Sequence, residues 1–146
     1  MTVSFAKSEA EIEKCFPILV QLRPNLTKEG YMAQAKRQME NGYRMAYLED
    51  RGNVVAVAGV RIIENFVCGR YMYVDDLVTD GGNRSKGYGS KLFDGLVEYA
   101  KKEKCNELHL DSKVHRFDAH RFYLRKRMSI TAHHFGISLV DKPDKQ

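Results

Sequence analysis

The sequence is poor in cysteine and proline and has no long hydrophobic run. It contains three of each residue among 146, with no internal repeat, low-complexity segment or Pro/Gly-rich linker. No stretch approaches the ~20 predominantly apolar residues of a transmembrane helix, and residues 1–5 lack the basic and apolar regions of a signal peptide. We therefore expect a cytoplasmic protein that does not bind a membrane.

The three cysteines, Cys15, Cys68 and Cys105, form no close-spaced pair and do not have the spacing of metal ligands. They fit the reduced structural thiols of a cytosolic protein. His133 and His134 are a tempting pair, but adjacent residues of a strand point to opposite faces, which makes a poor metal site. The sequence therefore predicts no metal.

The length suits one domain, residues 1–146, with a single core. The net charge is +5, and the excess is local, because six cationic residues and one acid, Asp118, lie in residues 113–127. This basic patch is interpreted either as a solvated helix face or as an anion site. It lacks the interleaved aromatics and the helix-turn-helix spacing of nucleic-acid-binding proteins, so we expect no nucleic acid as a partner.

The first half of the chain predicts a strand, two helices and three strands. Residues 2–6 are typical of a short strand. Ser8 and Glu11 match a capping box, which begins a helix that runs to about residue 22 and stops before Pro24. A second helix is expected over residues 27–40. Residues 44–48 and 54–64 form a hairpin pattern, and residues 71–79 are a third β-rich run.

The second half predicts helix, strand, helix and strand. Apolar residues recur at helical spacing in residues 86–103, with charged residues on the other face. A strand over 107–112, a helix over 119–126 and a last strand over 130–140 are expected. The helix between strands 71–79 and 107–112 makes those strands parallel neighbours. The order β-α-α-β-β-β-α-β-α-β predicts an α/β fold of the α+β type, with a mixed, mostly antiparallel central sheet and helices on both faces.

Residues 81–90 form a glycine-rich loop between a strand and the clearest helix. A helix N-terminus offers unpaired N–H groups and a positive dipole end to phosphate. Gly87 and Gly89 allow close approach of a ligand, and Arg84 and Lys86 add positive charge. A flexible strand-to-helix turn is the alternative. The nucleotide-triphosphatase loop is excluded because Tyr88 follows Gly87, and the dinucleotide fingerprint is excluded because a small residue is missing three positions after Gly89.

The pattern Arg84-x-x-Gly87-x-Gly89 resembles the acyl-CoA-binding signature of the GNAT superfamily of N-acetyltransferases. Residues 76–79 and 107–110 look like the fourth and fifth strands of that family, and residues 119–123 look like its Ala-x-x-Phe-Tyr helix. The resemblance implies the acyl-CoA N-acyltransferase fold, with acetyl-CoA as cosubstrate. It also implies a CoA-binding segment made of Arg84, Ser85, Lys86, Gly87, Tyr88, Gly89 and Ser90.

Three departures from the family pattern bear on the site. Arg116 replaces an asparagine that is frequent in the family, and Arg127-Met128 replaces its Gly-Phe. Both put contacts with the pantetheine arm in doubt. The chain also has one expected terminal strand where many members have a hairpin. This predicts a more open acceptor site, or one completed by a second subunit in a homodimer.

The resemblance implies direct attack of an amine on the thioester. Tyr123 matches the general-acid tyrosine of the family in position, and the backbone N–H groups of Leu77, Val78 and Thr79 would stabilise the oxyanion where the parallel strands part. The base remains open between Asp75 and Asp76, which as neighbours on a strand should point to opposite faces. Three histidines nearby in sequence are weaker candidates for the base: His109, His115 and His120.

The leading interpretation is an acetyl-CoA-dependent N-acetyltransferase, in which the acceptor is a primary amine of a small molecule or peptide. The alternative is a non-catalytic acyl-CoA-binding or regulatory module. Residues 8–43 would form part of the acceptor side, with Tyr31, Met32, Met39 and Tyr43 as candidate lining. Those four residues also fit the core face of amphipathic helices, which is the interpretation we prefer.

Overall fold

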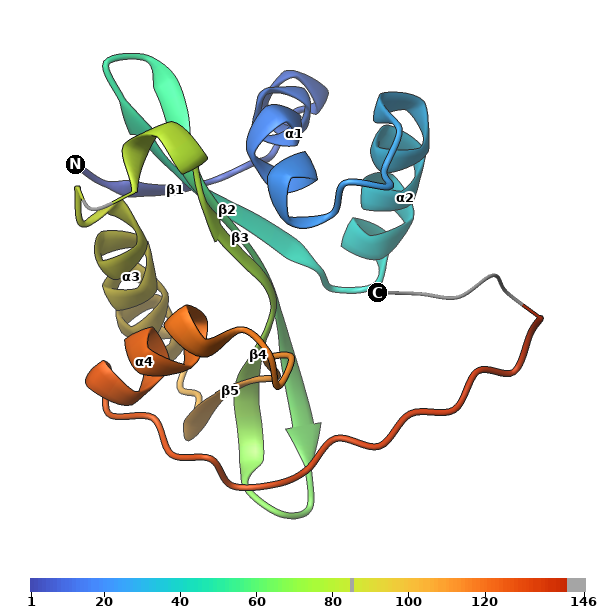
Figure 1. Ribbon diagram of the computed structural model, residues 1–146, viewed down its shortest axis with the longest axis vertical. Coiled ribbons are helices and arrows are strands. Elements are labelled where there is room, and N and C mark those ends of the chain that lie inside the picture. Colours follow the sequence, from blue (N-terminus) through green and yellow to red (C-terminus); the bar gives the residue numbers. More distant parts are fainter. Residues whose placement is uncertain (85, 142–146) are drawn as a thin grey trace. The chain divides into compact units, whose positions relative to one another are not determined.

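The computed structural model describes residues 1–84 and 86–141. The chain divides into two compact units, residues 1–110 and residues 111–146, which are described separately below (Figure 1). None of the described helices is both long enough and apolar enough to cross a bilayer.

The first unit follows the predicted order of elements closely. Its elements are β1 (Val3–Phe5), α1 (Glu9–Leu22), α2 (Lys28–Glu40), β2 (Arg44–Asp50), β3 (Asn53–Asn65), β4 (Gly69–Thr79), a 3₁₀ turn at Gly81–Asn83, α3 (Tyr88–Lys102) and β5 (Glu107–Leu110). The five strands form one sheet in the order β1-β2-β3-β4-β5. The first three pairs are antiparallel and β4 pairs with β5 in parallel, which confirms the expected mixed, mostly antiparallel sheet.

Helices cover both faces of this sheet, as expected (Figure 1). On one face, α1 and α2 bury a cluster that includes Cys15, Leu19 and Tyr31 against Val57 of β3. On the other face, α3 buries Leu92 and its apolar neighbours against β2, β3 and β4. The middle of the sheet is therefore buried, whereas much of β4 is only half-buried and can hold polar side chains.

Local sequence signals explain where α1 and α2 begin. Ser8 Oγ accepts a hydrogen bond from the N–H of Glu11 at 3.1 Å, and Glu11 Oε1 accepts one from the N–H of Ser8 at 3.0 Å. These two bonds complete the predicted capping box. Thr27 Oγ1 likewise accepts from the N–H of Gly30 at 3.1 Å and caps α2.

A bulge interrupts the pairing of β3 with β4. Gly59 lies opposite Asp76 and Val60 lies opposite Val74, which leaves Asp75 as an extra residue on β4. A bulge of this kind breaks the alternation of side chains along a strand. It lies at the two aspartates that the sequence singled out as candidate bases.

The described residues of the second unit, 111–141, contain one helix, α4 (Phe117–Arg125). The strand expected over residues 130–140 is wrong, because the described residues after α4 contain no strand. The apolar alternation that suggested it is present, and Phe135, Ile137 and Leu139 are each at least 85% exposed. Alternation gives a segment the capacity to pair, but a strand also needs a hydrogen-bonding neighbour.

Candidate active site

The glycine loop joins the end of β4 to the start of α3, as predicted. Gly87 is the N-cap residue of α3 and has a left-handed backbone with φ of +80°. A side chain at this φ would strain the backbone. Among the described residues no side chain caps α3, and the first turn of the helix holds no acidic residue. The first N–H groups of α3 are therefore suited to receive an anion.

Gly89 and Tyr88 serve packing as well as ligand approach. A Cβ at Gly89 would lie 2.9 Å from Thr79 Oγ1, so its small size lets α3 approach the end of β4. The side chain of Tyr88 is buried, and its hydroxyl donates a hydrogen bond to Asp50 Oδ2. Because the Tyr88 side chain is occupied in this way, the predicted role of Tyr88 in CoA binding would fall to its backbone N–H.

The remaining predicted residues of the loop differ in what the structure shows of them. Arg84 and Lys86 are exposed, and Ser90 is half-buried in the first turn of α3. Ser85 lies outside the described residues. Two cations and the helix N-terminus thus come together in one short segment, which suits a diphosphate.

A hydrogen-bond network holds the start of the loop. Gln21 of α1 donates to Asp80 Oδ1 at 2.8 Å and accepts from the N–H of Gly81 at 2.8 Å. Asn83 donates to Asp80 Oδ2 at 2.7 Å. Together the bonds from Gln21 and Asn83 lower the pKa of Asp80. The loop motif does not predict this role of Gln21, which lies 60 residues before Gly81 in the chain.

The prediction that Asp75 and Asp76 point to opposite faces is wrong, because the bulge brings both carboxylates to the same face. Arg61 donates to both oxygens of Asp75, at 2.7 and 2.8 Å. Arg61 lies two residues after Gly59 on β3, so the two share a face. A Cβ at Gly59 would lie 2.6 Å from Asp76 Oδ2, which places the Asp76 carboxylate on that same face.

Asp76 is held by two donors from distant parts of the chain. Tyr43 donates its hydroxyl to Asp76 Oδ2 at 2.8 Å, and Arg23 Nε donates to Asp76 Oδ1 at 3.1 Å. Burial, followed by the charge of Asp76, raises the pKa of Tyr43 well above its ordinary value, so the phenol remains a donor. A Cβ at Gly59 would overlap the Tyr43 hydroxyl. The hydrogen bond between Tyr43 and Asp76 therefore requires the glycine at this position.

Asp76 also lines a pocket of about 170 Å³ between α1, α2 and the sheet. Tyr31 and Tyr43, two of the four predicted lining residues, lie in its wall and are also buried in the core, so both interpretations apply to them. Met32 and Met39 pack against the core cluster of this face. The pocket wall is formed by Leu19, Arg23, Leu26, Tyr31, Gln34, Ala35, Gln38, Tyr43, Met45 and Asp76.

The parallel strands part where the sequence placed the oxyanion site. β4 and β5 pair only from Tyr71 to Val74 of β4, opposite Glu107 to Leu110 of β5. Beyond Val74, the ladder of β4 within residues 1–110 runs only to β3, and it includes Leu77, Val78 and Thr79. Backbone groups on the β5 side of this stretch therefore have no strand partner in that unit, and N–H groups among them can bind an oxygen.

Tyr123 lies in α4, in the second unit. Its ring stands edge-on to that of Phe122, with centroids 5.6 Å apart. Burial raises the pKa of Tyr123, with Arg116 opposing the shift. The phenol is therefore protonated at neutral pH, as a general acid must be. In the basic patch, Arg121 pairs with Asp118 at 3.0 Å.

The three histidines proposed as weaker bases have separate surroundings. His109 Nε2 lies 2.6 Å from Glu107 Oε1 on β5. His120 Nε2 lies 2.8 Å from the carbonyl oxygen of Lys113, within the second unit. His115 is exposed. None of them lines the pocket that holds Asp76.

Comparison with known proteins identifies the family. Residues 10–128 match the model of the acetyltransferase (GNAT) family. The chain is 32% identical over 120 residues to the uncharacterized N-acetyltransferase YhdJ of Bacillus subtilis (strain 168), a match that covers 82% of this chain and 84% of the relative. It is 31% identical over 105 residues to glucosamine 6-phosphate N-acetyltransferase 1 of Oryza sativa subsp. japonica, covering 66% of this chain and 64% of the relative. The chain therefore belongs to the GNAT family of acetyltransferases.

A solved structure supports the same fold. The aminoglycoside N-acetyltransferase AAC(6')-Iy, determined in complex with CoA, matches with a TM-score of 0.81 over 93% of each chain. The sequence identity is 12%, so this match concerns the fold alone. The architecture is the acyl-CoA N-acyltransferase fold that the sequence predicted.

Proposed function

We propose that this chain is an acetyl-CoA-dependent enzyme that transfers the acetyl group to a primary amine of a small molecule or peptide by direct attack. One observation carries the proposal. Along β4, the strand loses its parallel partner after Val74, the carboxylate of Asp76 then lines a pocket, and the strand ends at a loop whose glycine caps α3. This arrangement supports the proposal of a proton acceptor, an oxyanion site and an anion site along one strand.

The α3 N-terminus is proposed to bind the diphosphate of CoA. Its backbone N–H groups from Gly87 to Ser90 would donate to phosphate oxygens, and Arg84 and Lys86 would supply charge. The absence of an acidic residue in the first turn favours this role.

Asp76 is proposed as the group that accepts the proton of the amine, directly or through water. An amine with a pKa near ~10 is mostly protonated at neutral pH, so a base must remove its proton before attack. Asp75 is a poorer candidate because it is not among the residues that line the pocket. Asp76 is only 13% exposed, and its pocket is lined mainly by apolar and uncharged side chains.

Tyr123 is proposed as the acid that protonates the departing CoA thiolate. This role requires that the two units act together as one acetyltransferase domain over residues 1–146. The extent of the family match, residues 10–128, supports that proposal because it spans both units.

The acceptor is proposed to be a primary amine, and the relatives suggest where to start. A glucosamine 6-phosphate acetyltransferase is among them, so amino sugar phosphates belong in a panel with polyamines, aminoglycosides and peptides. The test is release of free CoA from acetyl-CoA with each amine. Tight acetyl-CoA binding without release for any amine would instead favour the non-catalytic acyl-CoA-binding module.

Compartment and assembly complete the proposal. We propose the cytoplasm, supported by the three cysteines, which are free thiols in the structure. We also propose a homodimer, in which a second copy covers the sheet edge at β5 and the apolar residues that follow α4.

A further inference from the structure

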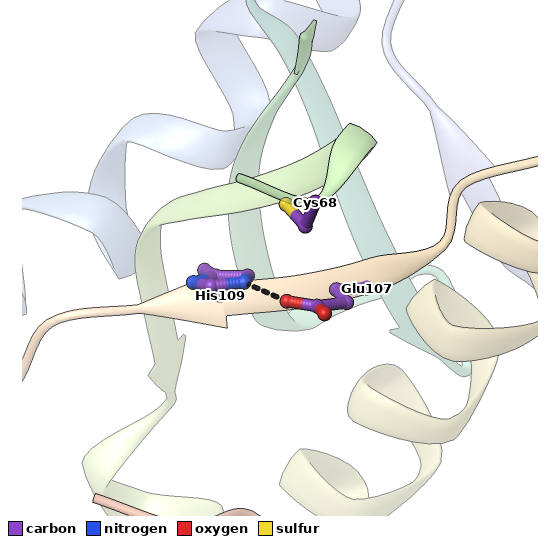
Figure 2. A group of neighbouring side chains, drawn as sticks. All are labelled: Cys68, Glu107 and His109. Carbon is purple, nitrogen blue, oxygen red and sulfur yellow. Dashed lines mark hydrogen bonds and ion pairs between the residues drawn. The ribbon is translucent and has the colours of Figure 1, made fainter. Parts of the chain in front are cut away.

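Three side chains on the first unit form a cluster that lies outside the proposed active site. Cys68 is in the turn between β3 and β4, and Glu107 and His109 are on β5. The sulfur, one carboxylate oxygen and one ring nitrogen all lie within 4.8 Å of one another. Figure 2 shows the thiol over the strand that carries the other two side chains. His109 Nε2 lies 2.6 Å from Glu107 Oε1.

The topology explains why Glu107 and His109 meet. They are two residues apart on an edge strand, so their side chains share one face. The ring of His109 also stands edge-on to Tyr71 of β4, with centroids 5.1 Å apart. This contact limits the rotation of the imidazole, and the cluster is partly pre-organised.

A set of backbone interactions holds Cys68 above β5. Asn65 Oδ1 accepts hydrogen bonds from the N–H groups of Val67 and Cys68, both at 3.0 Å, which closes the turn. Asn106 Nδ2 donates to the carbonyl oxygen of Cys68 at 2.8 Å and thereby ties the turn to the start of β5. Gly69 permits this approach, because a Cβ there would lie 2.9 Å from Asn106 Nδ2.

We propose that Cys68, Glu107 and His109 bind a Zn²⁺ ion, with a fourth position open to water. Thiolate, carboxylate and imidazole are the three protein ligands that zinc uses, at distances of about 2.0 to 2.3 Å. Ligand atoms around one tetrahedral zinc lie roughly 3–4 Å apart, so small side-chain rotations suffice here. The side chains of His109 and Glu107 are 39% and 53% exposed, which leaves a path for the ion and for a bound water.

Binding of Zn²⁺ would break the contact between His109 and Glu107 and replace it with bonds to the ion. Cys68 would lose its thiol proton to solvent, and His109 would bind through Nε2 with its ring proton on Nδ1. The thiolate and the carboxylate together match the charge of the ion. The ion would clamp the β3–β4 turn to the edge strand.

The test uses the full chain and does not depend on acetyltransferase activity. Zn²⁺ binding is followed by calorimetry, and Co²⁺ is used as a spectroscopic substitute, because a thiolate ligand gives a charge-transfer absorption. Cys68→Ser and His109→Asn remove one ligand each. Cys105→Ser is the matched control, because Cys105 is also a partly buried free thiol, at the turn between α3 and β5.

The parent and Cys105→Ser should each bind one Zn²⁺, show the Co²⁺ absorption and melt at a higher temperature with zinc present. Cys68→Ser should lose the absorption and the saturable binding, and His109→Asn should lose the saturable binding. Thermal melts without metal show whether each variant is folded. Absence of saturable binding in the parent, or unchanged binding in a folded Cys68→Ser variant, would overturn the proposal.

Discussion

Asp76 and Asp75 are neighbours in sequence with different surroundings. Asp76 lines a pocket and accepts from Tyr43 and Arg23, whereas Asp75 is held at both oxygens by Arg61. The sequence identified the pair as candidate bases. It could not identify their partners, because Tyr43 and Arg23 lie 33 and 53 residues from Asp76.

This difference gives the first prediction. Asp76→Asn should lower kcat by about 10²–10⁴, the usual contribution of a general base. Steady-state kinetics with the best amine measure this fall. Asp75→Asn is the matched control and should keep the parent rate. Thermal melts show whether the loss of the Arg23 pair affects folding. If both variants keep the parent rate, the base lies elsewhere.

Tyr123 gives the second prediction. Tyr123→Phe removes only the hydroxyl, so the ring contact with Phe122 should survive. We expect kcat to fall by about 10²–10⁴ with the Kd for acetyl-CoA nearly unchanged, because the proton is donated mainly in the transition state. Steady-state kinetics and calorimetry measure the two quantities. Turnover near the parent rate would mean that Tyr123 only packs, and joint loss of binding and thermal stability would mark it as structural.

At the scale of elements, local signals predicted the helices well. The capping box, the Thr27 cap and the apolar spacing in α3 each involve residues within about two turns of one another. The bulge in β4 was missed because it depends on the register with β3. The last strand was wrong because alternation alone cannot supply a pairing partner.

The loop before α3 gives the third prediction. Gly87→Glu should abolish acetyl-CoA binding measured by calorimetry, because a carboxylate at the helix N-terminus would repel the diphosphate. Gly42→Glu is the matched control. Gly42 also has a left-handed backbone with open space around it, but it lies between α2 and β2. Gly89→Glu should behave like Gly87→Glu. Undiminished acetyl-CoA binding in both variants would contradict the proposal that this loop binds CoA.

The start of α1 gives the fourth prediction, which concerns pH. Backbone hydrogen bonds from Lys7 and Ser8 lower the pKa of Glu11 from 4.5 to about 2. A group with a lowered folded-state pKa contributes stability above its unfolded pKa and loses it as pH falls through the folded value. Glu11→Gln should therefore melt at a lower temperature than the parent near pH 7. The difference should shrink as pH falls from about 4.5 towards about 2. If the difference in melting temperature stays constant across this range, the charge of Glu11 does not contribute to stability.

At the scale of the whole molecule, two features lack a strand partner among the described residues. Among the described residues, β5 pairs only with β4, which leaves one edge open. The exposed Phe135, Ile137 and Leu139 keep the spacing of a strand face. An open edge and an unpaired apolar segment favour association between copies.

This gives the fifth prediction, a homodimer at tens of micromolar protein, an order-of-magnitude choice for obligate contacts. Light scattering should give twice the chain mass of 16.8 kDa. The triple variant Phe135→Ser, Ile137→Ser and Leu139→Ser should give the chain mass itself. Ser138→Ala, on the alternate side of the segment, should leave the assembly unchanged. If light scattering shows that the parent chain is a monomer, the homodimer proposal is wrong.

The sequence by itself determined the helices, the first five strands, the parallel crossover and the glycine loop with its family. All of these are set by caps, by periodicity and by backbone demands within short stretches of chain. Only the tertiary structure decided which carboxylate lines the pocket, that both aspartates share a face, and that Cys68 meets Glu107 and His109 from 39 and 41 positions away. Those outcomes depend on strand register and on contacts between distant segments, because side chains meet there only after the sheet has formed.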